Sequence, residues 1–162
     1  MALTLPQRAT LAAHIRASAD AEVITALAGR NDTEMARLYN LDSGITIWKS
    51  SVSPAEYRAA IDWTEVDNLT IGKARIWEWV TQDMSVAFDA TNANIRAGLA
   101  QAWVTNSETR TNLLNVAKRL ATVAEGVFAN GEGAGTPADP DTASWTGNLT
   151  HTDVGKALNE NP

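Results

Sequence analysis

The sequence predicts a mainly α-helical protein: a helical bundle with a long central helix, one or two short β segments and an extended C-terminal arm. Helix-capping patterns recur ahead of apolar residues spaced three to four apart, and the longest such repeat covers about residues 105–129. Residues 131–141 are rich in Gly, Pro and Asp, as flexible linkers are. We therefore expect a helical domain over residues 1–130, then a flexible linker and extended arm over residues 131–162.

Three short helices are expected in the first forty residues. Thr4 and Gln7 form a capping-box pattern ahead of the first apolar stripe. Asp20 is a cap for the second helix, which Gly29 ends, and Asn31 is a cap for the third. Each start is marked by a short polar side chain that accepts hydrogen bonds from free backbone N–H groups.

The middle of the chain begins with a β segment and continues as helices. Residues 44–50, "GITIWKS", alternate β-branched and aromatic side chains and are too few for a helix. Ser53 and Glu56 form a second capping box ahead of a helix, and a further helix begins near Leu69. Residues 95–103 place apolar side chains four apart, which predicts another helix.

The central helix is expected from Thr105 to about Ala129. Thr105 and Glu108 form its capping box, and its apolar stripe is wide enough to pack on two neighbouring helices. Asn130 and Gly131 end it.

The arm follows. "SWTGNLT" is suited to one short strand, and Thr150 with Asp153 caps a short last helix. Residues 131–150, fully stretched, span roughly 65 Å at about 3.3 Å per residue. The arm is therefore expected to reach another subunit.

Composition limits the classes of function. At 162 residues with 44% hydrophobic and 20% charged side chains, the chain is an ordinary globular protein with a core of its own. It has no cysteine, which excludes disulfides, thiolate metal sites and thiol catalysis. Its longest apolar runs are too short for a signal peptide or membrane span, so we expect a soluble protein without membrane contact. A net charge of −6 argues against binding nucleic acid through the overall field.

Residues 62–79, "DWTEVDNLTIGKARIWEW", are the strongest candidate for chemistry. Asp62, Glu65 and Asp67 are able to form a carboxylate cluster for acid–base or metal work. Their spacing matches neither a calcium loop nor a helical metal motif with histidine. The simpler interpretation, which we favour, is that Asp67 or Asn68 caps the helix beginning near Leu69 and that acidic residues crowd its positive N-terminal end. We therefore expect no enzyme, no cofactor and no metal.

Tryptophan is unusually frequent, with six residues against two Phe and two Tyr. Trp77 and Trp79 lie about 160° apart in helical projection, with Trp79 beside the apolar stripe, so one intramolecular core does not easily bury both. Lys73 and Arg75 precede them by four residues, where each cation is able to lie over an indole. Either both faces are covered within one domain, or one face meets a partner chain.

Candidate interface residues follow from this pattern. They are Trp48, Trp77, Trp79, Trp145, Lys73 and Arg75. Trp145 is included because it lies beyond the linker, outside any helical stripe, and is expected to pack on a neighbour. His14 and His151 stand alone in different segments and are expected to be surface or capping residues.

Three long segments carry a family resemblance. They are "ITIWKSSVSPAEYRAAIDWTEVDNLTIGKARIWEW", "RTNLLNVAKRLATVAEGVFANGEGAGTPADP" and "WTGNLTHTDV". Across roughly residues 1–155 the chain resembles small proteins from the structural gene clusters of tailed bacteriophages, and it is similar to their head-to-tail connector (adaptor) proteins.

The resemblance implies a virion protein of the neck, assembled in the host cytoplasm. Connector proteins form a homo-oligomeric ring under the portal, and their extended C-terminal segments dock onto it. The implied partners are further copies of the chain, the portal protein and tail or neck proteins. DNA passes through the ring without sequence-specific binding, and acidic subunits suit that role because they repel the duplex. Another head- or tail-completion or assembly protein is the alternative.

Overall fold

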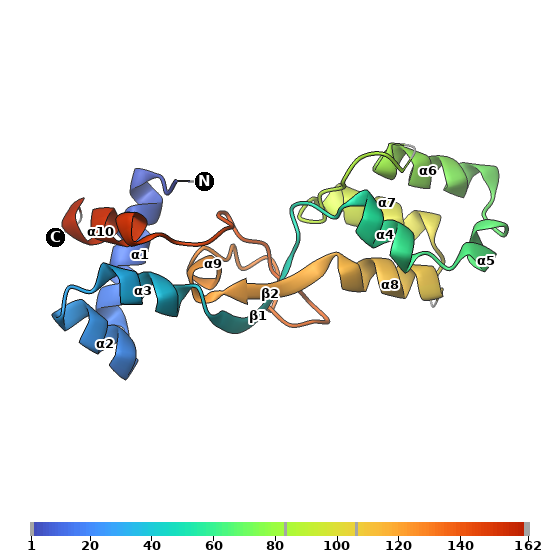
Figure 1. The fold of residues 1–162 in the computed structure, drawn as a ribbon. Helices are drawn as coiled ribbons and strands as arrows, with labels where there is room; N and C mark the ends of the chain where they lie inside the picture. Colours follow the sequence, from blue (N-terminus) through green and yellow to red (C-terminus); the bar gives the residue numbers. More distant parts are fainter. Residues whose placement is uncertain (1, 83, 106, 161–162) are drawn as a thin grey trace. The chain divides into compact units, whose positions relative to one another are not determined.

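The computed structural model describes residues 2–82, 84–105 and 107–160. These residues form ten helices and one two-stranded antiparallel sheet (Figure 1). The chain divides into two compact units. The terminal unit contains residues 1–47 and 120–162, and the insert unit contains residues 48–119. The fold is therefore mixed, and the prediction of a mainly α bundle with a long central helix and an extended arm is wrong.

The elements follow the chain in this order. The first part holds α1 (Leu5–Ala17), α2 (Ala21–Ala28), α3 (Asp32–Tyr39) and β1 (Asp42–Trp48). The middle holds α4 (Pro54–Ala60), α5 (Trp63–Val66), α6 (Ile71–Thr81), α7 (Ala93–Ala102) and α8 (Glu108–Val116). The last part holds β2 (Lys118–Thr122), α9 (Val123–Val127) and α10 (His151–Glu160).

Four of the predicted caps begin helices as expected, whereas α8 is capped by Ser107 and not by the predicted Thr105–Glu108 box. The Thr4 capping box begins α1 and the Ser53 capping box begins α4, each with a proline in the first turn. The Asp20 carboxylate accepts the backbone N–H groups of α2, and the Asn31 amide oxygen does the same for α3. These local hydrogen bonds satisfy donors that the helix itself leaves free.

The expected central helix is divided into three elements. Helix α8 ends at Val116, residues 118–122 form β2, and α9 begins at Val123. Strand β2 pairs with β1, and this pairing overrides the helical periodicity of the sequence. A start signal also lies inside the stripe, because Thr122 and Glu125 form a capping box for α9.

Residues 131–162 are part of the terminal unit and do not form an extended arm. The Asp141 carboxylate accepts the N–H groups of Gly131 at 3.1 Å and Glu132 at 2.9 Å, which fixes the glycine-rich segment. The Thr46 N–H donates to the Gly135 carbonyl at 2.8 Å, and the Asp141 N–H donates to the Thr46 carbonyl at 3.0 Å. The division at residue 130 is thus replaced by one in which both ends of the chain share a unit.

The C-terminal segment supplies core residues to the terminal unit. Trp145 is only 3% exposed and packs edge-to-face on Phe128, with ring centroids 5.6 Å apart. Val154 and Ala157 are buried where α10 lies against α1 and α3 (Figure 1). Leu149 is held by two hydrogen bonds between its backbone and the Asn40 side chain. The terminal unit therefore depends on its last thirty residues for a closed core.

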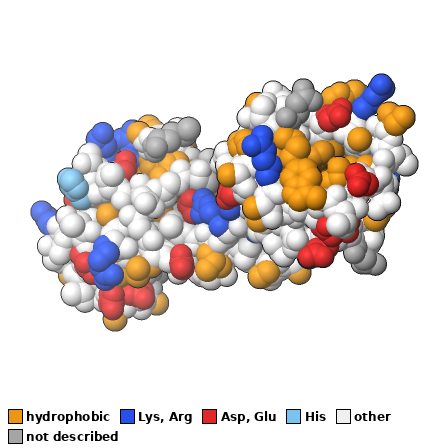
Figure 2. Space-filling view, turned by 45° about the vertical axis from the view of Figure 1, so that its right-hand side comes forward, with side chains coloured by type: hydrophobic (Ala, Val, Ile, Leu, Met, Phe, Trp, Pro, Cys, Tyr) orange, Lys and Arg blue, Asp and Glu red, His pale blue; other side chains and the backbone are white. Residues whose placement is uncertain are grey.

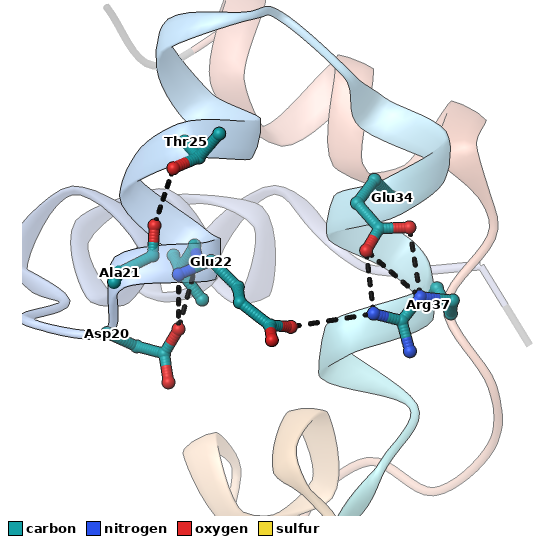
Figure 3. A network of polar contacts seen from close by, with 7 residues as sticks. Asp20, Ala21, Glu22, Thr25, Glu34 and Arg37 are labelled. Carbon is teal, nitrogen blue, oxygen red and sulfur yellow. Dashed lines mark hydrogen bonds and ion pairs between the residues drawn. The ribbon is translucent and has the colours of Figure 1, made fainter.

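A polar network joins α2 to α3 on the surface of the terminal unit. The Arg37 guanidinium lies between two carboxylates, 2.6 Å from Glu34 and 3.6 Å from Glu22 (Figure 3). All three side chains are open to solvent. Solvent screens exposed ion pairs of this kind, so the network contributes little to stability.

The insert unit has a core rich in aromatic side chains. Trp77 makes edge-to-face contacts with Trp103 at 5.6 Å and Tyr57 at 5.8 Å, and Tyr57 stacks on Phe88 at 5.7 Å. Helix α6 packs closely on α7 at Gly98, where an added Cβ would lie 3.1 Å from a Val80 methyl group. This packing fixes which side of α6 faces solvent.

Candidate functional site

The three candidate carboxylates have structural positions in the insert unit. Asp62 caps α5 and accepts hydrogen bonds from the N–H and hydroxyl of Thr64, which lower the pKa of its carboxyl. The Glu65 oxygens accept the N–H groups of Glu108 and Thr109, so Glu65 caps α8. Hydrogen bonding to Thr109 lowers the pKa of Glu65, while desolvation opposes that change.

Asp67 does not extend these caps into a cluster. It is the C-cap of α5, and its side chain is exposed. Within the part of the chain that the structure describes, no three acidic or histidine side chains lie close enough together to hold a metal ion. Asp62 and Glu65 cap α5 and α8, whereas Thr70 caps the helix that follows, α6. The expectation that Asp67 or Asn68 caps that helix is therefore wrong.

The two tryptophans of α6 lie on opposite sides of the helix. Trp77 is 6% exposed in the core of the insert unit, whereas Trp79 is 75% exposed. The expectation that Trp79 borders the core stripe is wrong. The α6 surface that packs on α7 is centred between Val80 and Trp77, which leaves Trp79 outside it.

Exposed apolar side chains form a ridge along the outer face of α6. Ile71 is 77% exposed, and it lies two turns before Trp79 with the exposed Arg75 between them. Gly72 shares this face, and nothing lies within 4 Å of the position that a Cβ would occupy there. We call Ile71, Gly72, Arg75 and Trp79 the α6 ridge.

An apolar groove of about 350 Å³ lies beside the ridge in the insert unit. It is lined by Ile61, Trp63, Val66, Leu69, Ala74, Trp77, Glu78 and Met84. We call this the α5–α6 groove. Figure 2 shows hydrophobic side chains gathered on the insert unit, with acidic and basic side chains at their edges. Trp63 is 57% exposed at the groove and was missed by the sequence analysis, which had no signal beyond its position directly after the Asp62 cap.

Cation–π contacts occur at a different tryptophan from those expected. Among the described residues, they lie at the half-buried Trp48, with Arg96 at 5.0 Å and Lys118 at 5.8 Å from the ring centroid. Burial lowers the pKa of Lys118. The expected stacking of Lys73 and Arg75 on Trp77 and Trp79 is not found within the described ranges.

The remaining candidates divide between core and surface. Trp145 and Trp77 are core residues, so the surface hypothesis does not extend to them. His14 is exposed, and its Nδ1 lies 2.8 Å from the hydroxyl of Tyr39, whose pKa burial raises to about 12. His151 is the first residue of α10.

Charge is divided unequally between the two units. The terminal unit has five Lys and Arg against eleven Asp and Glu, which accounts for the whole net charge of −6. The insert unit has eight of each sign and is formally neutral. The α6 ridge and the α5–α6 groove thus lie on the insert unit, whose net charge of zero does not repel a second insert unit.

Comparisons with protein-family models, curated proteins and solved structures found no match for this chain. None of the helices in the described ranges has both the length and the apolar character that crossing a bilayer requires.

Proposed function

We propose that this chain is a structural protein of a tailed-bacteriophage virion, a head-to-tail connector (adaptor) subunit that forms a ring between portal and tail. The observation that carries the proposal is the α6 ridge together with the α5–α6 groove. Both present large apolar and aromatic surface to solvent. Aromatic residues of this kind are enriched at protein interfaces.

The charge division supports the same role. A neutral insert unit allows many copies to approach one another, while a terminal unit of net charge −6 repels DNA that passes nearby. Such a ring guides the duplex without sequence-specific contacts. The portal protein and tail or neck proteins are its proposed partners, and its proposed location is the virion neck.

The ring does not require a free C-terminal arm. Residues 131–162 complete the core of the terminal unit. The proposed contacts between subunits are therefore made by folded surfaces of the chain. This changes the expected basis of assembly, from an arm that orders on binding to preformed surfaces that meet.

Labelling of the chain in purified particles tests the proposal. An antibody or gold label is expected at the neck, and particles made without the protein are expected to be filled heads without attached tails. A label elsewhere in the head or tail refutes the connector role and favours another completion protein. Absence of the chain from particles overturns both functions.

A further inference from the structure

We propose that the α6 ridge of one copy docks in the α5–α6 groove of a second copy, with Trp79 as the anchor, in a head-to-tail contact. This inference specifies the subunit contact of the proposed ring and rests on that proposal for its biological setting. Its physical basis is the shape, charge and area of two surfaces on the insert unit.

Shape favours one indole as the occupant of the groove. The groove holds about 350 Å³ and its walls are mainly apolar, with Trp63, Leu69 and Met84 among them. Trp79 is exposed on a helix, and a tryptophan anchored in an apolar pocket is typical of an interface hot spot. Gly72 lies two turns before Trp79 on the ridge, and its empty Cβ position lets a second backbone approach closely.

Gly72 has no intramolecular reason to be glycine. It is the second residue of α6, its φ is not positive, and nothing lies within 4 Å of the position that a Cβ would occupy. A close external neighbour accounts for a small residue there, since the residue serves neither a turn nor an internal contact.

Charge complementarity selects a second copy. The ridge carries Arg75, with Lys73 beside it, and the groove carries Glu78 on its wall and the exposed Asp67 close by in sequence. Among the described residues none of these four side chains takes part in a hydrogen bond or ion pair. When Trp79 enters a neighbour's groove, Arg75 is one turn away on the same face and comes within reach of the neighbour's Glu78.

The available area is that of a weak contact. Trp79 is 75% and Ile71 is 77% exposed, so at about 200 Å² for each large side chain they together present about 300 Å². Covering them with an equal area of groove buries about 600 Å², which is less than the roughly 1,000 Å² that a stable specific interface clears. A single contact is therefore expected to be weak, and ring closure strengthens it by making the last contact intramolecular.

The contact is directional because ridge and groove are different surfaces. Contacts between unlike surfaces generate rings when the rotation closes, whereas a two-fold contact uses the same surface on both partners and stops at a dimer. The proposed ring needs the first kind. Two variants, each lacking one surface, distinguish these cases.

The test uses the full chain, followed by sedimentation velocity over a concentration series. Trp79→Ala removes the ridge anchor, and Ala74→Trp fills the groove from its own wall. We expect the wild type to self-associate and each variant to do so at least about 30-fold more weakly, which is the hot-spot threshold of 2 kcal/mol at 1.4 kcal/mol per tenfold. A 1:1 mixture is expected to form a species of twice the 17.3 kDa chain mass and nothing larger.

The mixture is the decisive sample. Only Ala74→Trp still has a ridge and only Trp79→Ala still has a groove, so one directional contact forms and growth stops. Ile24→Ala, which trims an exposed apolar residue of α2, is the matched control and is expected to associate like the wild type. A monomeric wild type, an unimpaired Trp79→Ala variant or a mixture no better than its components overturns the inference.

Charge reversal repeats the test should Ala74→Trp fail to fold. Arg75→Glu and Glu78→Arg change exposed side chains only. Each is expected to weaken association about fivefold, and their mixture is expected to recover it. No recovery in the mixture overturns the inference. Because these assays use purified protein, they fail or succeed independently of where the label lies in the particle.

Discussion

Replacing Trp145 by alanine is expected to destabilise the terminal unit strongly. The side chain is almost fully buried among Phe128 and its neighbours in the core. Burying about 200 Å² at about 25 cal/mol per Å² corresponds to roughly 5 kcal/mol. Residual burial in the unfolded chain lowers this figure by about 10–40%. We therefore expect a loss of about 3–5 kcal/mol, in the range known for large aromatic residues replaced by alanine.

Thermal and urea unfolding followed by circular dichroism measure this loss. For a unit of this size, about 4–8 °C of Tm is lost per kcal/mol, so the unfolding transition of the terminal unit is expected to fall by more than about 10 °C. Trp79→Ala is the matched control, since it removes the same side chain from an exposed position and is expected to change stability by less than about 0.5 kcal/mol. A Trp145→Ala protein that melts within 1–2 °C of the wild type would refute the packed C-terminal segment.

Three further results are expected. Deleting residues 131–162 is expected to abolish the folded terminal unit, seen as lost helical signal and exposed hydrophobic surface; a soluble, fully helical truncation contradicts this. Glu65→Ala is expected to lower Tm more than Asp67→Ala, because of these two side chains it is Glu65 that accepts N–H groups at the start of α8; equal Tm values argue against that role. The Lys49 hydrogen bond lowers the pKa of Glu56 from 4.5 to about 2. The stabilisation that ionised Glu56 provides is present above pH 4.5 and is lost as pH falls toward 2. Glu56→Gln is therefore expected to make the urea midpoint of unfolding depend less on pH between those values, and an unchanged pH dependence counts against the Lys49–Glu56 pair.

Local capping chemistry made most helix starts predictable from the sequence. The Thr4, Asp20, Asn31 and Ser53 caps all act within four residues of the backbone groups that they satisfy. A short stretch of sequence therefore contains everything needed to predict such a cap. The break inside residues 105–129 is not predictable in this way, because it depends on the pairing of β2 with β1, which joins positions more than seventy residues apart.

The C-terminal segment shows why composition alone misleads. Its Gly, Pro and Asp residues are those of a linker, yet Asp141 and Asp139 use their carboxylates to hold backbone N–H groups within the same segment. The same side chains that favour turns in a loose chain fix one turn when a core lies beneath it. Trp145 supplies the anchor for that core, although no periodic pattern marks it as buried.

The tryptophans of α6 were recognisable as lying on opposite sides of the helix, but which one faces the core was not. The answer depends on Tyr57 and Trp103, which reach Trp77 from α4 and the end of α7. Once Trp77 fills the aromatic core, helical geometry leaves Trp79 in solvent, and no rearrangement within α6 is able to bury both. Trp79 is therefore exposed because Trp77, on the opposite side of α6, packs in the core of the insert unit. Its removal is then expected to be nearly neutral for the monomer and costly for association, which separates an interface residue from a folding residue.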